Sequence, residues 1–341
     1  MRSFLKPTAG FVCLAALTCA GCSSEPDSES SSSSSSQPSA TGAASAESAT
    51  TTYAPYVSAT TASDNDSAGS PATYNLAFVI AGGSSCTPKW NGTTAIGDSA
   101  VKSRISALTR SGGAVRVSFG GASGKELAST CDSASELAAA YGAALDAAGA
   151  TEADFDIEGE QLTDSDSVAL RSEAIALLQK ERSDLAVTFT LPVMPSGLDG
   201  DSVALLESAN DNGVQVSTVN IMTMNYGSSY DEDMGDYAET SAQAAHDQLQ
   251  DIFGLSDAGA WKGLALTSMI GVNDVDNETF SLSDAAQVRS FAEEKGVAWV
   301  SMWSTFRDQQ CEGDDASSDD AATNCSGVDQ GAGDFAEAFT G

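Results

Sequence analysis

Short runs rich in β-branched and aromatic residues alternate, from residue 53 onward, with longer Ala-rich stretches in which apolar residues recur at helical spacing. This alternation predicts strands separated by helices. The predicted strands are Tyr53–Ser58, Tyr74–Ile80, Ala114–Phe119, Ala153–Ile157, Leu185–Leu191, Gln215–Met224, Leu264–Ile270 and Ala298–Trp303. The predicted helices are Ile96–Thr109, Lys125–Ala148, Ser167–Lys180, Ser202–Asn210, Thr240–Phe253 and Ser283–Lys295, with a final helix near Gly333–Phe339.

Strands and helices in this order are typical of a (β/α)8 TIM barrel, so we predict a single α/β catalytic domain over residues 51–341. The connection after the first strand, Ala59–Ala72, is too rich in Gly, Ser and Asp for a helix, and the first unit is therefore expected to be irregular. A doubly wound open sheet is the alternative. That fold normally has a Gly-rich phosphate-binding turn after its first strand, and the sequence has none there.

Residues 1–22 have the layout of an export signal, in which basic residues precede an apolar run, Phe11–Ala20. The run is too short to span a bilayer as a helix of the mature protein. It ends in a sequence that resembles a bacterial lipoprotein cleavage box, with Cys22 as the lipidated residue; plain secretion is the alternative. Residues 23–50 are mostly Ser, Ala, Glu and Pro and predict a disordered linker. We therefore expect an exported protein that is either a lipoprotein on the outer surface of the cell membrane or secreted.

The formal net charge of −33, from 48 Asp and Glu against 15 Lys and Arg, argues against nucleic acid and anionic membrane as partners, because both need a basic surface. A lipid anchor would be the chain's only contact with a membrane. The single histidine, His246, falls in a polar helical run and is expected to be exposed. With one histidine, a Ser-His-Asp site has no other base and a zinc site built on histidines is nearly excluded. We expect no metal, no cofactor and a monomer.

Seven cysteines are present, of which two lie in the export signal and one is Cys22. The remaining four, Cys86, Cys131, Cys311 and Cys325, are too far apart in sequence for a typical metal site. An even number in an exported chain suggests two disulfides. Cys311 with Cys325 would close an acidic loop, and Cys86 with Cys131 would join two neighbouring loops; the sequence leaves the connectivity open.

The strongest candidate for chemistry is Asp154-Phe155-Asp156-Ile157-Glu158, in which acidic and apolar residues alternate with the period of a strand. Three carboxylates on one face of a buried strand repel one another and are costly to desolvate, so such a row indicates function rather than stability. A calcium loop of the EF-hand type is the alternative. Its twelfth position requires a bidentate Glu and here holds Ser165, and its ninth holds Leu162.

In a barrel, polar residues at the carboxyl ends of strands form the active site. Besides the three carboxylates, these ends supply Ser118, Gly120, Gly121, Met222, Met224, Asn225, Tyr226 and Trp303, with Arg307 and Asp308 just beyond. Carboxylates, an amide and aromatic rings around one opening suit a sugar, whose ring faces stack on aromatic side chains. Taken alone, Trp303 could equally be a core residue; its position at the end of the last strand favours the site.

These residues resemble glycoside hydrolase family 18, the chitinases and related endo-β-N-acetylglucosaminidases, over most of residues 53–339. The resemblance rests on Ser118-Phe119-Gly120-Gly121, Asp154-Phe155-Asp156-Ile157-Glu158 and Ser301-Met302-Trp303-Ser304. Two further stretches, Tyr53-Ala54-Pro55-Tyr56-Val57 and Met269-Ile270-Gly271-Val272-Asn273-Asp274, resemble an actinobacterial or bacillary branch. The sequence departs from the family pattern at Thr151, where a first motif Asp is usual and where a hydrogen bond to Asp154 would compensate. It departs again at Tyr226, which falls one residue late.

The resemblance implies a retaining hydrolysis of chitin or N-acetylglucosamine oligosaccharides in which the substrate supplies the nucleophile. Glu158 would be the general acid, Asp156 would orient the acetamido group, and Asp154 would hold Asp156 through a shared proton. The two neighbouring acids would raise the pKa of Glu158. The residues expected to bind substrate are Ser118, Met224, Asn225, Tyr226 and Trp303. The alternatives are a non-catalytic chitin-binding lectin, which would usually lack the acid, and an endo-β-N-acetylglucosaminidase acting on N-glycans.

Overall fold

The computed structural model describes residues 50–311 and 324–341. The expected export signal, the lipidated Cys22 and the linker up to residue 49 lie outside the described residues. Within the described ranges, no helix is long and apolar enough to cross a membrane.

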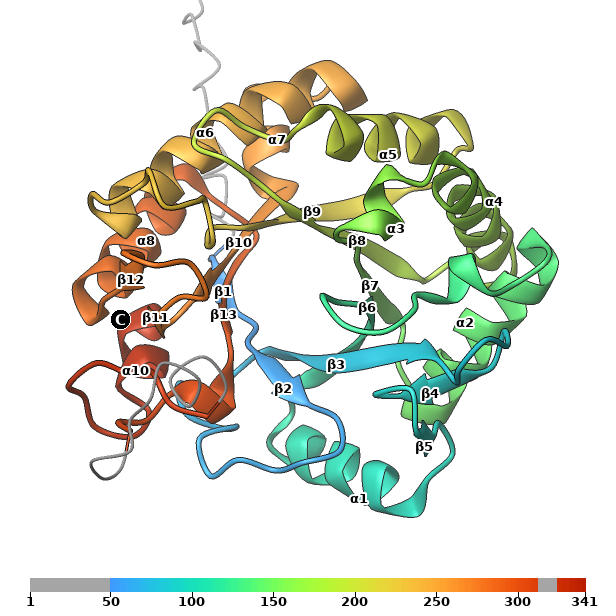
Figure 1. Cartoon of the computed structure of the whole chain (residues 1–341), viewed down its shortest axis with the longest axis horizontal. Helices are drawn as coiled ribbons and strands as arrows, with labels where there is room; N and C mark the ends of the chain where they lie inside the picture. Colours follow the sequence, from blue (N-terminus) through green and yellow to red (C-terminus); the bar gives the residue numbers. More distant parts are fainter. Residues whose placement is uncertain (1–49, 312–323) are drawn as a thin grey trace, which may run out of the picture. The chain divides into compact units, whose positions relative to one another are not determined.

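A ring of parallel strands forms the centre of the domain, with helices around its outside (Figure 1). The strands of the ring are β1 (Thr52–Tyr53), β2 (Tyr56–Ser58), β3 (Thr73–Ala81), β6 (Ala114–Gly120), β7 (Glu152–Asp156), β8 (Ala186–Pro192), β9 (Val216–Met222), β10 (Leu264–Met269) and β13 (Trp299–Trp303). Strands β1 and β2 are two halves of the first predicted strand, interrupted at Pro55, which has no N–H to donate. The first half pairs with β13 and the second with β3, so this segment joins both ends of the sheet. The predicted TIM barrel is confirmed.

Helices follow the strands in the predicted order. They are α1 (Ser99–Leu108), α2 (Ala134–Ala148), α3 (Glu160–Thr163), α4 (Ser165–Glu181), α5 (Gly200–Asp211), α6 (Met234–Phe253), α7 (Asp257–Lys262), α8 (Leu282–Lys295) and α10 (Asp334–Thr340), with short 3-10 turns η1 (Thr109–Ser111), η2 (Leu127–Ser129) and η3 (Thr305–Arg307). Small strands in the connections are β4 (Pro88–Trp90), β5 (Thr94–Ala95), β11 (Gly271–Val272) and β12 (Thr279–Phe280).

The alternation within β7 orients its side chains as predicted. Phe155 is fully buried and packs between Phe119 and Phe189 of the two neighbouring strands, with ring centroids at 5.3 and 5.7 Å. Tyr141 of α2 lies 5.0 Å from the same ring, which places Phe155 on the side facing the helices. Because side chains alternate along a strand, Asp154 and Asp156 point into the barrel.

The predicted helix Lys125–Ala148 is wrong over its first third. Residues Leu127–Ser129 form the turn η2, and the helix begins only at Ala134, after Ser133, whose hydroxyl accepts the N–H of Glu136. Cys131 lies in the loop between them and is bonded to Cys86, with a Cα–Cα distance of 4.6 Å. Cys311 and Cys325 form the second disulfide, so both suggested pairings are confirmed. Two disulfides are typical of exported proteins.

The expectation that His246 is exposed is also wrong. Helix α7, which the sequence did not predict, covers it: the His246 ring stacks on Trp261 with centroids 4.1 Å apart. Only 1% of His246 is exposed, and its two ring nitrogens lie 2.9 Å from Asp247 Oδ1 and 3.1 Å from the Asp257 carbonyl oxygen. Its neighbours therefore give His246 a packing role.

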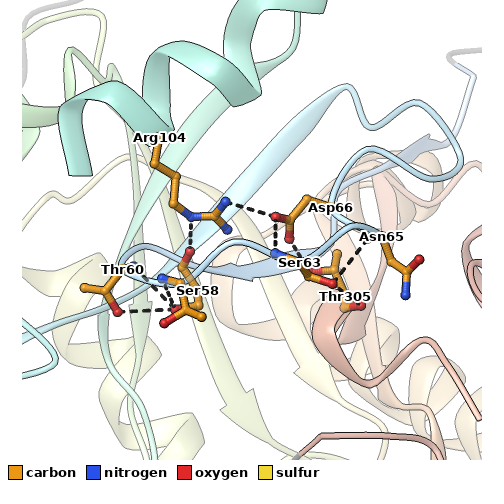
Figure 2. Close-up of polar contacts among 8 residues, drawn as sticks. Ser58, Thr60, Ser63, Asn65, Asp66, Arg104 and Thr305 are labelled. Atoms are coloured by element: carbon orange, nitrogen blue, oxygen red, sulfur yellow. Dashed lines mark hydrogen bonds and ion pairs between the residues drawn. The ribbon is translucent and has the colours of Figure 1, made fainter. Parts of the chain in front are cut away.

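The connection between β2 and β3 contains no helix, as predicted, and buried polar contacts hold it in place. Figure 2 shows Asp66 accepting hydrogen bonds from the Arg104 guanidinium at 2.9 Å and from the Thr305 hydroxyl at 2.7 Å. Arg104 also donates from Nε to the Ser58 carbonyl at 2.6 Å. Because Arg104 belongs to α1, which follows β3, and Thr305 follows β13, Asp66 joins the connection of the first unit to the second and last units of the barrel.

Replacing Asp66 with alanine is expected to lower the free energy of unfolding by about 3 kcal/mol, because the substitution leaves the Arg104 charge buried without its partner. The side chains of this pair are only 7% and 10% exposed. Denaturant unfolding measures the change. The matched control is Asp64→Ala in the same loop, where the residue is exposed and a change below about 0.5 kcal/mol is expected. Equal effects of the two substitutions would contradict a role for Asp66 in closing the barrel.

Candidate active site

Asp154, in the middle of β7, points into the barrel interior and is fully buried. Its carboxylate accepts hydrogen bonds from three hydroxyls: Tyr56 at 2.9 Å, Thr190 at 2.6 Å and Ser118 through a short contact. Burial raises the pKa of Asp154, and the hydrogen bonds from Ser118 and Thr190 oppose the rise. The donors come from β6 and β8, which flank β7, and from β2, so three strands besides β7 fix this carboxylate.

The network continues around the barrel to β9 and β10. Asn220 donates through Nδ2 to the Thr190 hydroxyl at 2.9 Å, and its Oδ1 accepts from the Thr267 hydroxyl at 2.9 Å. All three side chains are at most 2% exposed. A connected buried network of this kind holds its members in one arrangement.

Asp156 lies one layer above Asp154 and is 6% exposed. Its Oδ1 is buried and has no hydrogen-bond partner within the described residues, which is costly unless a ligand satisfies it. Burial, together with the charges of Glu158 and Asp154, raises its pKa well above the usual range. No hydrogen bond between Asp154 and Asp156 is present, so the structure does not show the expected shared proton.

The two glycines after Phe119 allow the chain to approach this site closely. Gly120 pairs directly with Asp156, and a Cβ there would lie 2.1 Å from the Asp156 carbonyl oxygen. At Gly121 a Cβ would lie 2.8 Å from the ring of Phe78. Both residues have positive φ, 101° and 87°. Only glycine fits here, which gives the Gly120-Gly121 pair a steric reason.

Glu158 follows β7 and is partly buried at the rim of the barrel. Burial is the largest cause of a rise in its pKa to about 7, and the negative charge of Asp274 adds to it. The predicted rise is therefore present, but its second cause is Asp274 rather than the two other acids of β7. A carboxyl group with a pKa near neutrality can hold a proton and donate it at the pH of most natural environments.

Asp156 and Glu158 open into one cavity of about 610 Å³. Its lining is Tyr56, Phe78, Ile80, Asn91, Ala122, Ser123, Gly124, Asp156, Glu158, Thr190, Met222, Met224, Asn225, Thr267, Met269, Asp274 and Trp303. The rings of Trp303 and Phe78 stack at 5.6 Å, and Tyr56 lies edge-on to Trp303 at 5.8 Å. The cavity thus combines carboxylates with an aromatic wall. Among the residues that the structure places, no cluster of three or more His, Cys, Asp and Glu is arranged to hold a metal ion.

Of the predicted substrate-binding residues, Met224, Asn225 and Trp303 line the cavity and Ser118 and Tyr226 do not. Ser118 is fully buried and donates to Asp154. Tyr226 is 5% exposed and its ring packs at 5.7 Å from Tyr237 of α6. Its hydroxyl accepts a hydrogen bond from Ser241. The one-residue displacement noted in the sequence directs Tyr226 away from the cavity.

Three other expectations about this region are corrected. Thr151 is exposed at the opposite end of β7, about 10 Å along the strand from Asp154, and does not compensate for the missing motif Asp. Arg307 is buried outside the cavity and donates to the carbonyls of Ile270 and Val272 at 2.7 Å each. Asp308 accepts the backbone N–H groups of Phe335 and Ala336 at the start of α10, so neither residue lies at the opening.

Sequence reasoning missed Tyr56, Thr190 and Asp274 as site residues. The rule that polar residues near the carboxyl ends of barrel strands form the site would have found them. Tyr56 lies on β2, Thr190 lies near the end of β8, and Asp274 follows β10.

No protein-family model matches the chain. The chain is 34% identical over 275 residues to a probable bifunctional chitinase/lysozyme of Escherichia coli (strain K12), which covers 75% of this chain and 31% of that protein. It is 33% identical over 276 residues to Endochitinase 11 of Metarhizium anisopliae, covering 75% of this chain and 52% of that protein. The chain therefore spans about a third and about half of the lengths of these two relatives.

A solved chitinase structure is also similar to this chain. Catalytic-site mutants of active domain 2 of the thermostable chitinase from Pyrococcus furiosus, complexed with chito-oligosaccharides, superpose with a TM-score of 0.73. The sequence identity is 29%, and the match covers 84% of this chain and 92% of that one. These three relatives come from a bacterium, a fungus and an archaeon, so the actinobacterial or bacillary branch stays a prediction.

Proposed function

We propose that this chain, which is similar to named chitinases, is a chitinase of the glycoside hydrolase family 18 type that hydrolyses β-1,4 linkages between N-acetylglucosamine units. One observation carries the proposal: the partly buried Glu158 and the buried, unpartnered Asp156 Oδ1 open into the same cavity of about 610 Å³. The first group can supply a proton, and the second can accept the N–H of an acetamido group. The stacked rings of Trp303 and Phe78 provide a surface for a sugar ring.

In the first step Glu158 donates its proton to the glycosidic oxygen as the bond to the anomeric carbon breaks. The carbonyl oxygen of the substrate's own acetamido group bonds to that carbon and forms an oxazolinium ion. Asp156 accepts the acetamido N–H and stabilises the positive charge that develops there. In the second step the Glu158 carboxylate takes a proton from water as the water oxygen bonds to the anomeric carbon and opens the oxazolinium ring. The anomeric configuration is therefore retained, and Glu158 is protonated again.

Asp154 serves this mechanism without touching the substrate. Its three hydroxyl donors stabilise it as a carboxylate beneath Asp156. A negative charge below Asp156 favours the protonated form of Asp156 before substrate binds, and the positive charge of the oxazolinium ion favours its ionised form afterwards. Asp156 can therefore follow the change of charge during the reaction.

Product analysis after incubation with N-acetylglucosamine oligosaccharides tests the proposal. We expect shorter N-acetylglucosamine oligosaccharides whose first-formed reducing ends have the β configuration. Binding without products would instead indicate a lectin. Release of N-glycans from a glycoprotein, with no cleavage of chitin oligosaccharides, would indicate an endo-β-N-acetylglucosaminidase that acts on N-glycans. Either result would reject the proposed function.

A further inference from the structure

A short insertion between β10 and α8, built on the hairpin of β11 and β12, brings a third carboxylate to the cavity. Asp274 lies in the turn of this hairpin, with its side chain exposed, and lines the same cavity as Glu158 and Asp156. The end of β7 and the residues just after it supply the other two acids. Asp274 therefore acts on the site from a separate element.

Asp274 is joined to Asn225 by two reciprocal hydrogen bonds. Its backbone N–H donates to Asn225 Oδ1 at 3.1 Å, and Asn225 Nδ2 donates to Asp274 Oδ2 at 3.3 Å. Asn225 has a φ of 56°, in the left-handed region that residues other than glycine seldom adopt. The insertion also holds the next part of this loop, because Glu278, 1% exposed, accepts the Gly227 N–H at 2.7 Å. Asn225 is thus held against the cavity from the β11–β12 hairpin.

The charge of Asp274 acts on Glu158 in a defined electrostatic setting. The titratable residues that line the cavity with Glu158 are Asp156 on β7, Tyr56 on β2 and Asp274 on the insertion, and the charge of Asp154 acts on Asp156. Of these, Asp274 is the charge that raises the pKa of Glu158, after the effect of burial. Arg307 is an opposing charge near Asp274: burial lowers its pKa to about 10, and the charge of Asp274 works against that fall. A negative group facing the acid across the cavity favours the protonated form of the acid.

We propose that Asp274 is a positioning residue of this active site: its hydrogen bonds hold Asn225 against the substrate, and its negative charge keeps the proton on Glu158 until the glycosidic oxygen takes it. This inference rests on the proposed function. It gives the β11–β12 insertion, which follows β10, a part in catalysis alongside Asp156 and Glu158. Asp274 acts through Asn225 and Glu158 rather than by attacking the sugar.

The pH dependence of kcat/KM for an N-acetylglucosamine oligosaccharide, compared between the wild-type chain and Asp274→Asn, tests the charge. Activity is lost as pH rises through the pKa of Glu158, because only the protonated acid can donate. Removing the negative charge lowers that pKa, so we expect the alkaline limb to move to lower pH by about one unit. The matched control is Asp276→Asn, an exposed acid of the same turn that is not among the cavity residues, which should leave the limb in place.

A second variant separates the hydrogen bond from the charge. In Asp274→Asn the new amide oxygen can still accept from Asn225, so KM should stay within about twofold of the wild-type value. Asp274→Ala removes the acceptor as well and should raise KM by about threefold to tenfold. Both variants change an exposed side chain, and an unchanged melting temperature confirms that the fold is retained.

Two results would overturn the inference. An alkaline limb in Asp274→Asn that moves by less than about 0.2 unit would exclude the effect of charge. A loss beyond about 10³-fold at every pH would indicate that Asp274 is a nucleophile and not a positioning residue. If the wild-type chain fails to cleave the oligosaccharide, the proposed function is rejected instead. A carbon-13 NMR titration of the Glu158 carboxyl then compares the wild-type chain with Asp274→Asn directly. The pKa of Glu158 is expected to be about one unit lower in Asp274→Asn, and an unchanged pKa would reject the inference.

Discussion

Replacing Glu158 with glutamine is expected to lower turnover of N-acetylglucosamine oligosaccharides by about 10²–10⁴-fold or more, while folding and oligosaccharide binding stay nearly unchanged. The amide has almost the shape of the carboxyl group but cannot donate a proton to the glycosidic oxygen. Its effect on binding is small because the aromatic wall and Asp156 remain. Turnover is measured by product formation, and binding by calorimetry with the same oligosaccharide.

The change from Glu to Gln has a matched control two residues further on. Glu160 is exposed on α3 and does not line the cavity, so Glu160→Gln should keep turnover within about twofold. If Glu158→Gln kept more than about a tenth of the wild-type turnover, Glu158 would not be the general acid, because the loss would fall below the usual range for such a group. Loss of both turnover and binding would point instead to a structural role.

The sequence predicted the parts of the fold that depend on local patterns. The alternation in Asp154-Phe155-Asp156-Ile157-Glu158 specifies which side chains face the helices and which face the barrel interior, and Phe155 packs accordingly. The repeated change from strand to helix periodicity was enough to predict a barrel. Both features depend on residues that are close together in the sequence, so no knowledge of distant contacts was needed.

Some features that depend on distant contacts were not predicted. His246 is buried because Trp261, fifteen residues later, stacks on it, and the polar residues around His246 carry no sign of this. Asp274 influences Glu158 because two connections more than a hundred residues apart in sequence lie across one cavity. Tyr226 shows the opposite error: its place in the sequence suggested the site, but packing against Tyr237 turned it away.

The choice between a nucleophile from the protein and one from the substrate depends on where the carboxylates lie. An enzyme with its own nucleophile needs a second carboxylate on the opposite face of the sugar from the acid. Asp156 ends β7 and Glu158 follows it by two residues, so both lie on the same side of the cavity. Asp274 is the one other carboxylate among the cavity's described lining residues, and its Oδ2 is engaged by Asn225. The acetamido oxygen of the substrate is therefore the expected nucleophile.

Cellotetraose and fully deacetylated chitosan oligosaccharides should consequently not be cleaved, although their rings are similar in size to N-acetylglucosamine. Without an acetamido oxygen, no oxazolinium ion can form, and Asp156 has no N–H to accept. A thiazoline analogue of the oxazolinium ion should inhibit, because it resembles the intermediate in shape and charge and intermediates of this kind are bound more tightly than substrate. Product analysis with each oligosaccharide, and inhibition of chito-oligosaccharide cleavage, measure both effects. Turnover of cellotetraose would contradict substrate assistance, and Asp274 would then be the first residue to test as the enzyme's own nucleophile.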